Sequence, residues 1–244
     1  MRAPTLAALT AAGLLGLGGL SACSSSDDSA AEEAPSAQEV LAEATATLDE
    51  TSGVQVSLVT DDLPEGVEGL LRAEGARSPP PSVGTPSPAA FDGVITVRFA
   101  GFEPEVPVVA VDDVVHAQVP LTTGWSQIDP AEYGAPDPAA LLGADGGFSS
   151  LLTSTDDVEA GEQVRGGTDN RDVLTTYTGT ISQEVAATII PSAEGDFDAS
   201  YAVSDGGELR SMELTGAFYG DGESMTYTVD FDDYGSSPEI TAPE

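Results

Sequence analysis

The chain contains no lysine and few cations of any kind. Seven arginines stand against 42 acidic side chains, so the 244 residues carry a formal net charge of −35. We expect no nucleic-acid partner, because neutralising phosphates requires a basic surface. An anionic bilayer should also repel this protein, so membrane attachment needs something other than electrostatics. The acidity is interpreted as a solvated, solubilising surface. Multi-site calcium binding is the lesser alternative, because no loop has the spacing of an EF-hand.

Cysteine and histidine each occur once, at Cys23 and His116. A single cysteine permits no intramolecular disulfide, and one histidine without a nearby thiol leaves the common zinc sites short of ligands. The sequence also lacks a G-x-S-x-G motif and a phosphate-binding glycine loop. We interpret His116 as a surface residue of a strand and not as a catalytic base. No enzyme activity, cofactor or metal is therefore expected.

The amino terminus has the features of a lipoprotein leader. Arg2 precedes an apolar stretch at 6–20, which has the length of a signal-peptide core and is short for a membrane span. Leu20-Ser21-Ala22-Cys23 follows at once and fits the lipobox, whose cysteine is diacylated before the peptide is cut. We predict a signal peptide over 1–22, acylation of Cys23 and anchoring at the outer face of the cell membrane. An ordinary secretory signal with an incidental cysteine is the alternative.

Anchoring by acyl chains would overcome the expected repulsion from a bilayer. Without the signal peptide the chain has 6 basic and 42 acidic side chains, a balance of −36, and two or three acyl chains suffice for stable attachment. Residues 23–37 are polar after the cysteine and lack periodicity, so we expect a disordered tether. Residues 38–50 then gather their leucines on one helical face. Ser36 and Glu39 have the spacing of a capping box at the start of this helix.

Most of the remaining chain alternates between apolar and polar residues as strands do. Strands are predicted at 54–58, 67–76, 95–99, 106–119 with a break at Asp112-Asp113, 125–128, 158–164, 173–181, 197–203, 212–218 and 225–231. Short helices are predicted from Asp137, near Phe148 and from Ser182, and a surface loop at the prolines of 78–88. The pattern predicts an α+β domain over 38–235, with helices covering the apolar face of an antiparallel sheet. Residues 236–244 form a tail.

The apolar face of this sheet has two interpretations. A strongly twisted sheet that curls around helices can leave room for an alkyl chain, and the small residues Ala117, Ala199, Gly179 and Gly216 would favour such a space. An acyl chain binds there without specific polar contacts, because each buried methylene contributes about 0.8 kcal/mol. The other interpretation is that these residues pack against one another and fill the core.

Four segments in this order resemble a known family. The chain is similar to the LppX/LprA/LprF/LprG lipoproteins of actinobacteria in the lipobox at Cys23, in VLAEATATLDETSGVQVSL, in DDVVHAQVPLTTGWSQID and in DPAALLGADGGFSSLLTSTDDVEAGEQVRGG. The resemblance extends over residues 38–235 and rests on the order and spacing of segments. Its most specific part is the helix start at Asp137-Pro138, followed by Gly146-Gly147 and Leu151-Leu152.

The resemblance implies a curved antiparallel half-barrel wrapped over helices, similar to the outer-membrane lipoprotein carriers. In that family a hydrophobic cavity holds the acyl chains of lipids or glycolipids, which are carried across the cell envelope, in some members together with a major-facilitator transporter. The residues of this chain that match cavity positions are Ile95, Val97, Phe99, Val115, Ala117 and Val119 on the sheet, and Leu141, Leu142, Leu151 and Leu152 on the covering helices. The alternative is an anchored structural or interaction domain with a filled core.

Two features depart from the family. The proline-rich loop at 79–88 looks longer than usual and could narrow the mouth of a cavity. The acidity and the absence of lysine weaken any attraction to anionic lipid head groups.

Overall fold

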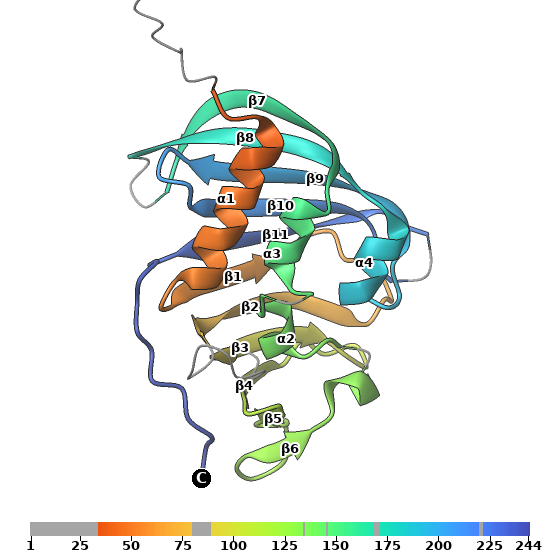
Figure 1. The fold of residues 1–244 in the computed structure, drawn as a ribbon. Coiled ribbons are helices and arrows are strands. Elements are labelled where there is room, and N and C mark those ends of the chain that lie inside the picture. Colours follow the sequence, from red (N-terminus) through yellow and green to blue (C-terminus); the bar gives the residue numbers. More distant parts are fainter. Residues whose placement is uncertain (1–33, 80–88, 134, 145, 168–170, 220–221) are drawn as a thin grey trace, which may run out of the picture. The chain divides into compact units, whose positions relative to one another are not determined.

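An antiparallel sheet dominates the part of the chain that the computed structural model describes (Figure 1). Its eleven strands are β1 (Val54–Val59), β2 (Gly69–Ser78), β3 (Ala90–Arg98), β4 (Glu105–Val111), β5 (Val114–Ala117), β6 (Ser126–Ile128), β7 (Asp156–Gly166), β8 (Asp172–Ile181), β9 (Glu194–Ser204), β10 (Leu209–Ala217) and β11 (Met225–Asp232). Their order is β6-β5-β4-β3-β2-β1-β11-β10-β9-β8-β7. Two meanders are therefore joined where the first strand pairs with the last.

The structure describes residues 34–79, 89–133, 135–144, 146–167, 171–219 and 222–244. The predicted signal peptide, Cys23 and most of the tether lie outside these ranges, as does most of the proline-rich loop. All the named elements and both hydrophobic clusters lie within Pro35–Glu244, which forms one compact unit. Because this fragment contains a complete core, we expect it to fold without the residues that precede it.

Four helices lie on one face of the sheet (Figure 1). They are α1 (Ala37–Glu50), α2 (Pro138–Leu141), α3 (Phe148–Thr153) and α4 (Gln183–Ile189), and a 3₁₀ turn, η1, spans Pro130–Tyr133. Thr45 of α1 donates to the carbonyl of Ser149 in α3 at 3.2 Å. The hydroxyls of Thr155 and Tyr201 lie 2.7 Å apart and connect the end of α3 to β9, and burial raises the pKa of Tyr201 to about 12. The predicted α+β fold, with helices over an antiparallel sheet, is confirmed.

The core has two parts. The larger cluster packs α1, α3 and α4 against β1 and β8–β11, with fully buried side chains that include Leu41, Leu152, Tyr201, Val229 and Phe231. The smaller cluster lies under α2, against β3, β4 and β5, and contains Phe91, Val106, Val108, Ala110, Val115, Ala117 and Ala139. The helices thus cover the inner face of strands β8–β11 more completely than that of strands β3–β5.

Small residues on the inner face do not leave the space that the sequence suggested. A Cβ added to Gly216 would lie 2.3 Å from the ring of Phe197, and one added to Gly179 would lie 2.5 Å from the methyl group of Thr155. The absence of a side chain at Gly216 and Gly179 therefore makes room for the side chains of Phe197 and Thr155. At these two positions the packed interpretation holds, because a larger neighbour occupies the volume at each position.

The capping box predicted for the first helix is confirmed. The backbone N–H of Glu39 donates to Oγ of Ser36 at 3.3 Å, and the carboxylate of Glu39 accepts from the backbone N–H of Ser36 at 2.8 Å. Hydrogen bonds from the Ser36 backbone and hydroxyl favour the charged carboxylate and hold the pKa of Glu39 below its ordinary value.

We expect Ser36→Ala to lower the free energy of unfolding by about 1 kcal/mol, because the first turn of α1 loses its cap. The pKa of Glu39 is lowered in the folded state, so its contribution is present above the unfolded pKa and is lost as the pH falls through the folded pKa. Urea unfolding at neutral pH and at pH values below about 4.3 checks both points. The difference between wild type and Ser36→Ala should shrink in acid, and a difference that grew would contradict this account.

Candidate functional site

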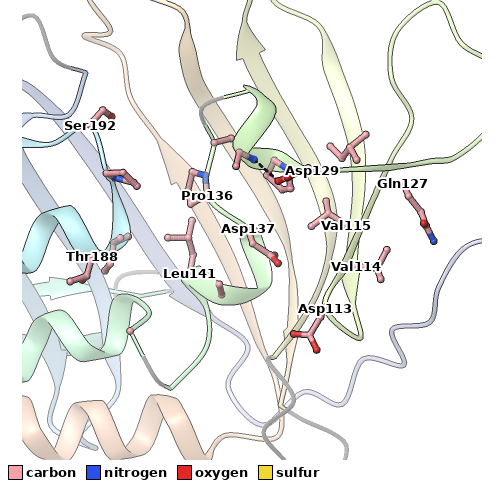
Figure 2. A pocket seen from close by; sticks show the side chains of 18 residues that line it. Asp113, Val114, Val115, Gln127, Asp129, Pro136, Asp137, Leu141, Thr188 and Ser192 are labelled. Atoms are coloured by element: carbon pink, nitrogen blue, oxygen red, sulfur yellow. Dashed lines mark hydrogen bonds between the residues drawn. The ribbon is translucent and has the colours of Figure 1, made fainter.

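An apolar pocket lies beside the smaller cluster (Figure 2). Its volume is about 940 Å³, within the range of roughly 300–1,000 Å³ that small-molecule sites occupy. Its walls come from β5 and β6, from the segment 129–141 and from the end of α4 with the residues after it. The lining residues are Asp113, Val114, Val115, Gln127, Ile128, Asp129, Pro130, Ala131, Ala135, Pro136, Asp137, Ala140, Leu141, Gly146, Thr188, Ile189, Pro191 and Ser192.

Figure 2 shows Val115 and Gln127 on one side of this pocket and Thr188 and Ser192 on the other, with Leu141 between them. Aliphatic residues and prolines make up most of the lining, and proline adds apolar surface without a free backbone N–H. Such a wall offers no directional bonds over most of its area. The pocket therefore suits an alkyl chain better than a polar substrate.

Local hydrogen bonds fix the wall between β6 and α2. Asp129 Oδ1 accepts from the backbone N–H of Ala131 at 3.0 Å, and the N–H of Ala135 donates to the carbonyl of Pro130 at 3.1 Å. Asp137 caps α2 as the sequence predicted, with Oδ1 accepting from the N–H of Ala139 at 2.8 Å. These contacts hold an irregular segment in place beside β5 and β6.

The Gly146-Gly147 pair allows the chain to turn tightly back on the end of α2 before α3 begins. Gly146 has a φ of 75°, a conformation that other residues rarely adopt. A Cβ at Gly147 would lie 2.2 Å from the carbonyl oxygen of Gly143 and 2.6 Å from that of Leu141. Six residues separate α2 from α3, and Leu141, the last residue of α2, lines the pocket.

Of the ten residues matched to cavity positions, Val115 and Leu141 line the pocket. Ile95, Ala117, Val119 and Leu142 pack in the smaller cluster, Leu151 and Leu152 are buried in the larger one, and Val97 is partly buried near the end of β3.

Phe99 does not belong with the other inward positions. The predicted strand at 95–99 ends at Arg98 in the structure, because Ala100 and Gly101 both have positive φ and turn the chain. Phe99 then pairs with Phe102 in an isolated bridge and is 55% exposed. The prediction that Phe99 faces inward extended the apolar–polar alternation one residue past the end of β3.

Sequence reasoning missed most of the pocket lining. Pro130, Ala131 and Pro136 lie in an irregular segment, and Pro191 and Ser192 follow the end of a helix. Such residues show neither helical nor strand periodicity, so pattern analysis has no signal for which way they face. The abundance of Pro and Ala between β6 and α2 was the one available hint of an apolar wall.

A metal site finds no support in the part of the chain that the structure describes. There, no three His, Cys, Asp or Glu side chains are grouped so that they could bind a metal ion. His116 is partly buried on β5, opposite Val109 and Gln127 on the neighbouring strands. None of the described helices is long and apolar enough to cross a bilayer.

Comparisons with known proteins point to one family. The LppX_LprAFG lipoprotein family matches residues 36–239. The fold is similar to that of LprF from Mycobacterium bovis, at 16% identity and a TM-score of 0.66 over 85% of this chain and 96% of that one. It is also similar to lipoprotein LppX from Mycobacterium tuberculosis, at 16% identity and a TM-score of 0.60 over 86% of this chain and 100% of that one.

The two kinds of comparison carry different weight. No curated protein matches the sequence, and identities of 16% to the solved structures show the fold alone. The family match, in contrast, spans the chain from the cap of α1 to beyond the last strand. The chain therefore belongs to the LppX_LprAFG lipoprotein family.

Proposed function

We propose that this protein is a lipid-binding lipoprotein, anchored through Cys23 at the outer face of the cell membrane, that carries acyl lipids or glycolipids across the cell envelope. The apolar pocket between β5, β6, α2 and the end of α4 is the observation that carries this proposal. The mechanism requires burial and release of acyl chains and no covalent step. A partner membrane, or a transporter of the kind the resemblance implies, would receive or deliver the lipid.

Burial of an acyl chain provides enough free energy for such a function. Each methylene removed from water contributes about 0.8 kcal/mol, so ten methylenes supply about 8 kcal/mol. That free energy corresponds to a dissociation constant of about 1 μM before ordering costs. A chain of this length thus binds tightly enough to be carried and weakly enough to be released to a bilayer.

Lipid content of the purified protein tests the proposal. Residues 35–244 would be purified from an actinobacterial host without detergent, and native mass spectrometry would be followed by organic extraction. We expect a stoichiometric acyl lipid bound to the folded protein. A protein that is empty and also refuses added acyl lipid would contradict lipid carriage and leave an anchored interaction domain.

Processing at Cys23 has a separate test. Cys23→Ala in the full chain should give neither a lipid adduct nor cleavage before residue 23, because the acylated thiol directs both steps. Intact-mass measurement of the membrane fraction checks this, with Ser24→Ala as the neighbouring control that should be processed normally. A wild-type protein cut before residue 23 but carrying no acyl mass would contradict anchoring at this cysteine.

A further inference from the structure

The polar part of the pocket lining has charge of one sign. Asp113, Asp129 and Asp137 contribute three carboxylates, and no arginine is found among the described residues that line the pocket. We propose that the pocket selects acyl lipids whose head group carries no net negative charge and offers hydrogen-bond donors, such as hydroxyl or ammonium groups. This inference rests on the proposed lipid binding and specifies its substrate class.

None of the arginines in the described part of the chain is among the residues that line this pocket. Six of the seven arginines lie in the described part of the chain, the seventh being Arg2. Arg72 and Arg98 pair with Glu74 and Glu103, and Arg210 lies within 4 Å of Asp172, Glu208 and Asp232. Arg77 is buried under α1, Arg165 lies on β7 and Arg171 precedes β8. The sequence contains no lysine, and His116 on β5 is not among the residues that line the pocket.

Backbone hydrogen bonds hold two of the three carboxylates in the wall. Asp129 and Asp137 each use Oδ1 to accept a backbone hydrogen bond, so their second oxygen remains as an acceptor for a ligand. Asp113 lies at the β4–β5 turn with a φ of 61°. A phosphate among these groups would meet acceptors and like charge, whereas a hydroxyl or ammonium group would find acceptors for its protons.

Binding of lipids that differ only in head group tests this selection. Lipid-free protein, residues 35–244, would be offered equimolar dioleoylglycerol, dioleoyl lysyl-phosphatidylglycerol and dioleoyl phosphatidylglycerol, and the bound species would be quantified by native mass spectrometry. The lysyl lipid carries ammonium groups and a net positive charge. We expect the neutral and cationic lipids to be bound at least about tenfold more than the anionic one at low ionic strength. The preference should shrink in 1 M salt, where charges are screened over about 3 Å.

A charge-matched pair of variants locates the source of the preference. Asp113→Asn/Asp129→Asn/Asp137→Asn removes three charges but keeps an oxygen for each cap, and asparagine tolerates the positive φ of Asp113. The control is Asp92→Asn/Asp205→Asn/Asp233→Asn, three exposed residues outside the pocket lining. We expect the preference to fall towards unity in the pocket variant and to persist in the control.

The outcomes separate this inference from the proposed function. Equal uptake of the anionic and neutral lipids would overturn head-group selection and leave lipid binding intact. An equal loss of preference in both triple variants would overturn the role of the pocket carboxylates, because net charge would then be the cause. Failure to bind any of the three lipids would overturn the proposed function, and the inference with it.

Discussion

Ala140→Trp is expected to reduce lipid binding by about a hundredfold. Ala140 lies on α2 with its side chain at the pocket, and it is exposed rather than part of either cluster. An indole at this position would displace roughly four methylenes of a bound chain and so remove about 3 kcal/mol of binding free energy. Titration of residues 35–244 with a fluorescent fatty acid measures the change in dissociation constant.

A matched substitution outside the pocket distinguishes blocking from disruption. Ala202→Trp introduces the same side chain at a partly exposed position of β9 that does not line the pocket. It should leave the dissociation constant within about threefold, or about 0.7 kcal/mol, of wild type. If both variants bind the fatty acid as wild type does while remaining folded, the pocket is not the lipid site.

Arg77→Ala is expected to lower the free energy of unfolding by about 3 kcal/mol. Arg77 is 2% exposed on β2, and its Nη1 donates to the carbonyl of Leu48 at 2.7 Å near the end of α1. Burial lowers the pKa of Arg77, whereas the nearby Asp49 and Tyr234 raise it. Arginine nevertheless remains charged at any physiological pH. Its removal leaves terminal carbonyls of α1 without a buried donor and opens a void.

Two comparisons separate the parts of this effect. Arg77→Met keeps most of the side-chain volume but loses the donors and the charge, so the expected loss is smaller, about 2 kcal/mol. Arg72→Ala on the same strand removes an arginine whose side chain is 54% exposed and paired with Glu74, and it should cost at most about 1 kcal/mol. Urea unfolding followed by circular dichroism measures all three. Equal losses for Arg72→Ala and Arg77→Ala would contradict a special role for the buried cation.

Local signals in the sequence were sufficient to predict the elements. The capping box at Ser36, the cap at Asp137 and the alternation that ends at Phe231 each depend on a few neighbouring residues, and the structure confirms all three. Boundaries were less accurate: β3 begins at Ala90, five residues before the predicted strand. Asp92-Gly93 has the composition of a turn, but the pairing of β3 with β2 and β4 keeps it extended.

The pocket could not be predicted in the same way. Its position depends on which elements are near each other in space, and the wall formed by Thr188 and Ser192 is distant in sequence from that formed by Val115. The small residues that suggested a cavity, Gly179 and Gly216, turned out to face side chains of matching size. The sequence thus indicated that helices would cover the sheet. The position of the pocket, in contrast, depends on irregular segments that have no sequence periodicity.

The junction of the two meanders has a consequence for biogenesis. β1 pairs with β2 on one side and with β11 on the other, for example at Val56 and Phe231. During synthesis β1 emerges early, and its second partner is the last strand of the chain. Until β11 arrives, β1 presents an open edge that other strands can join. The sheet therefore becomes continuous only when the chain is available as far as β11.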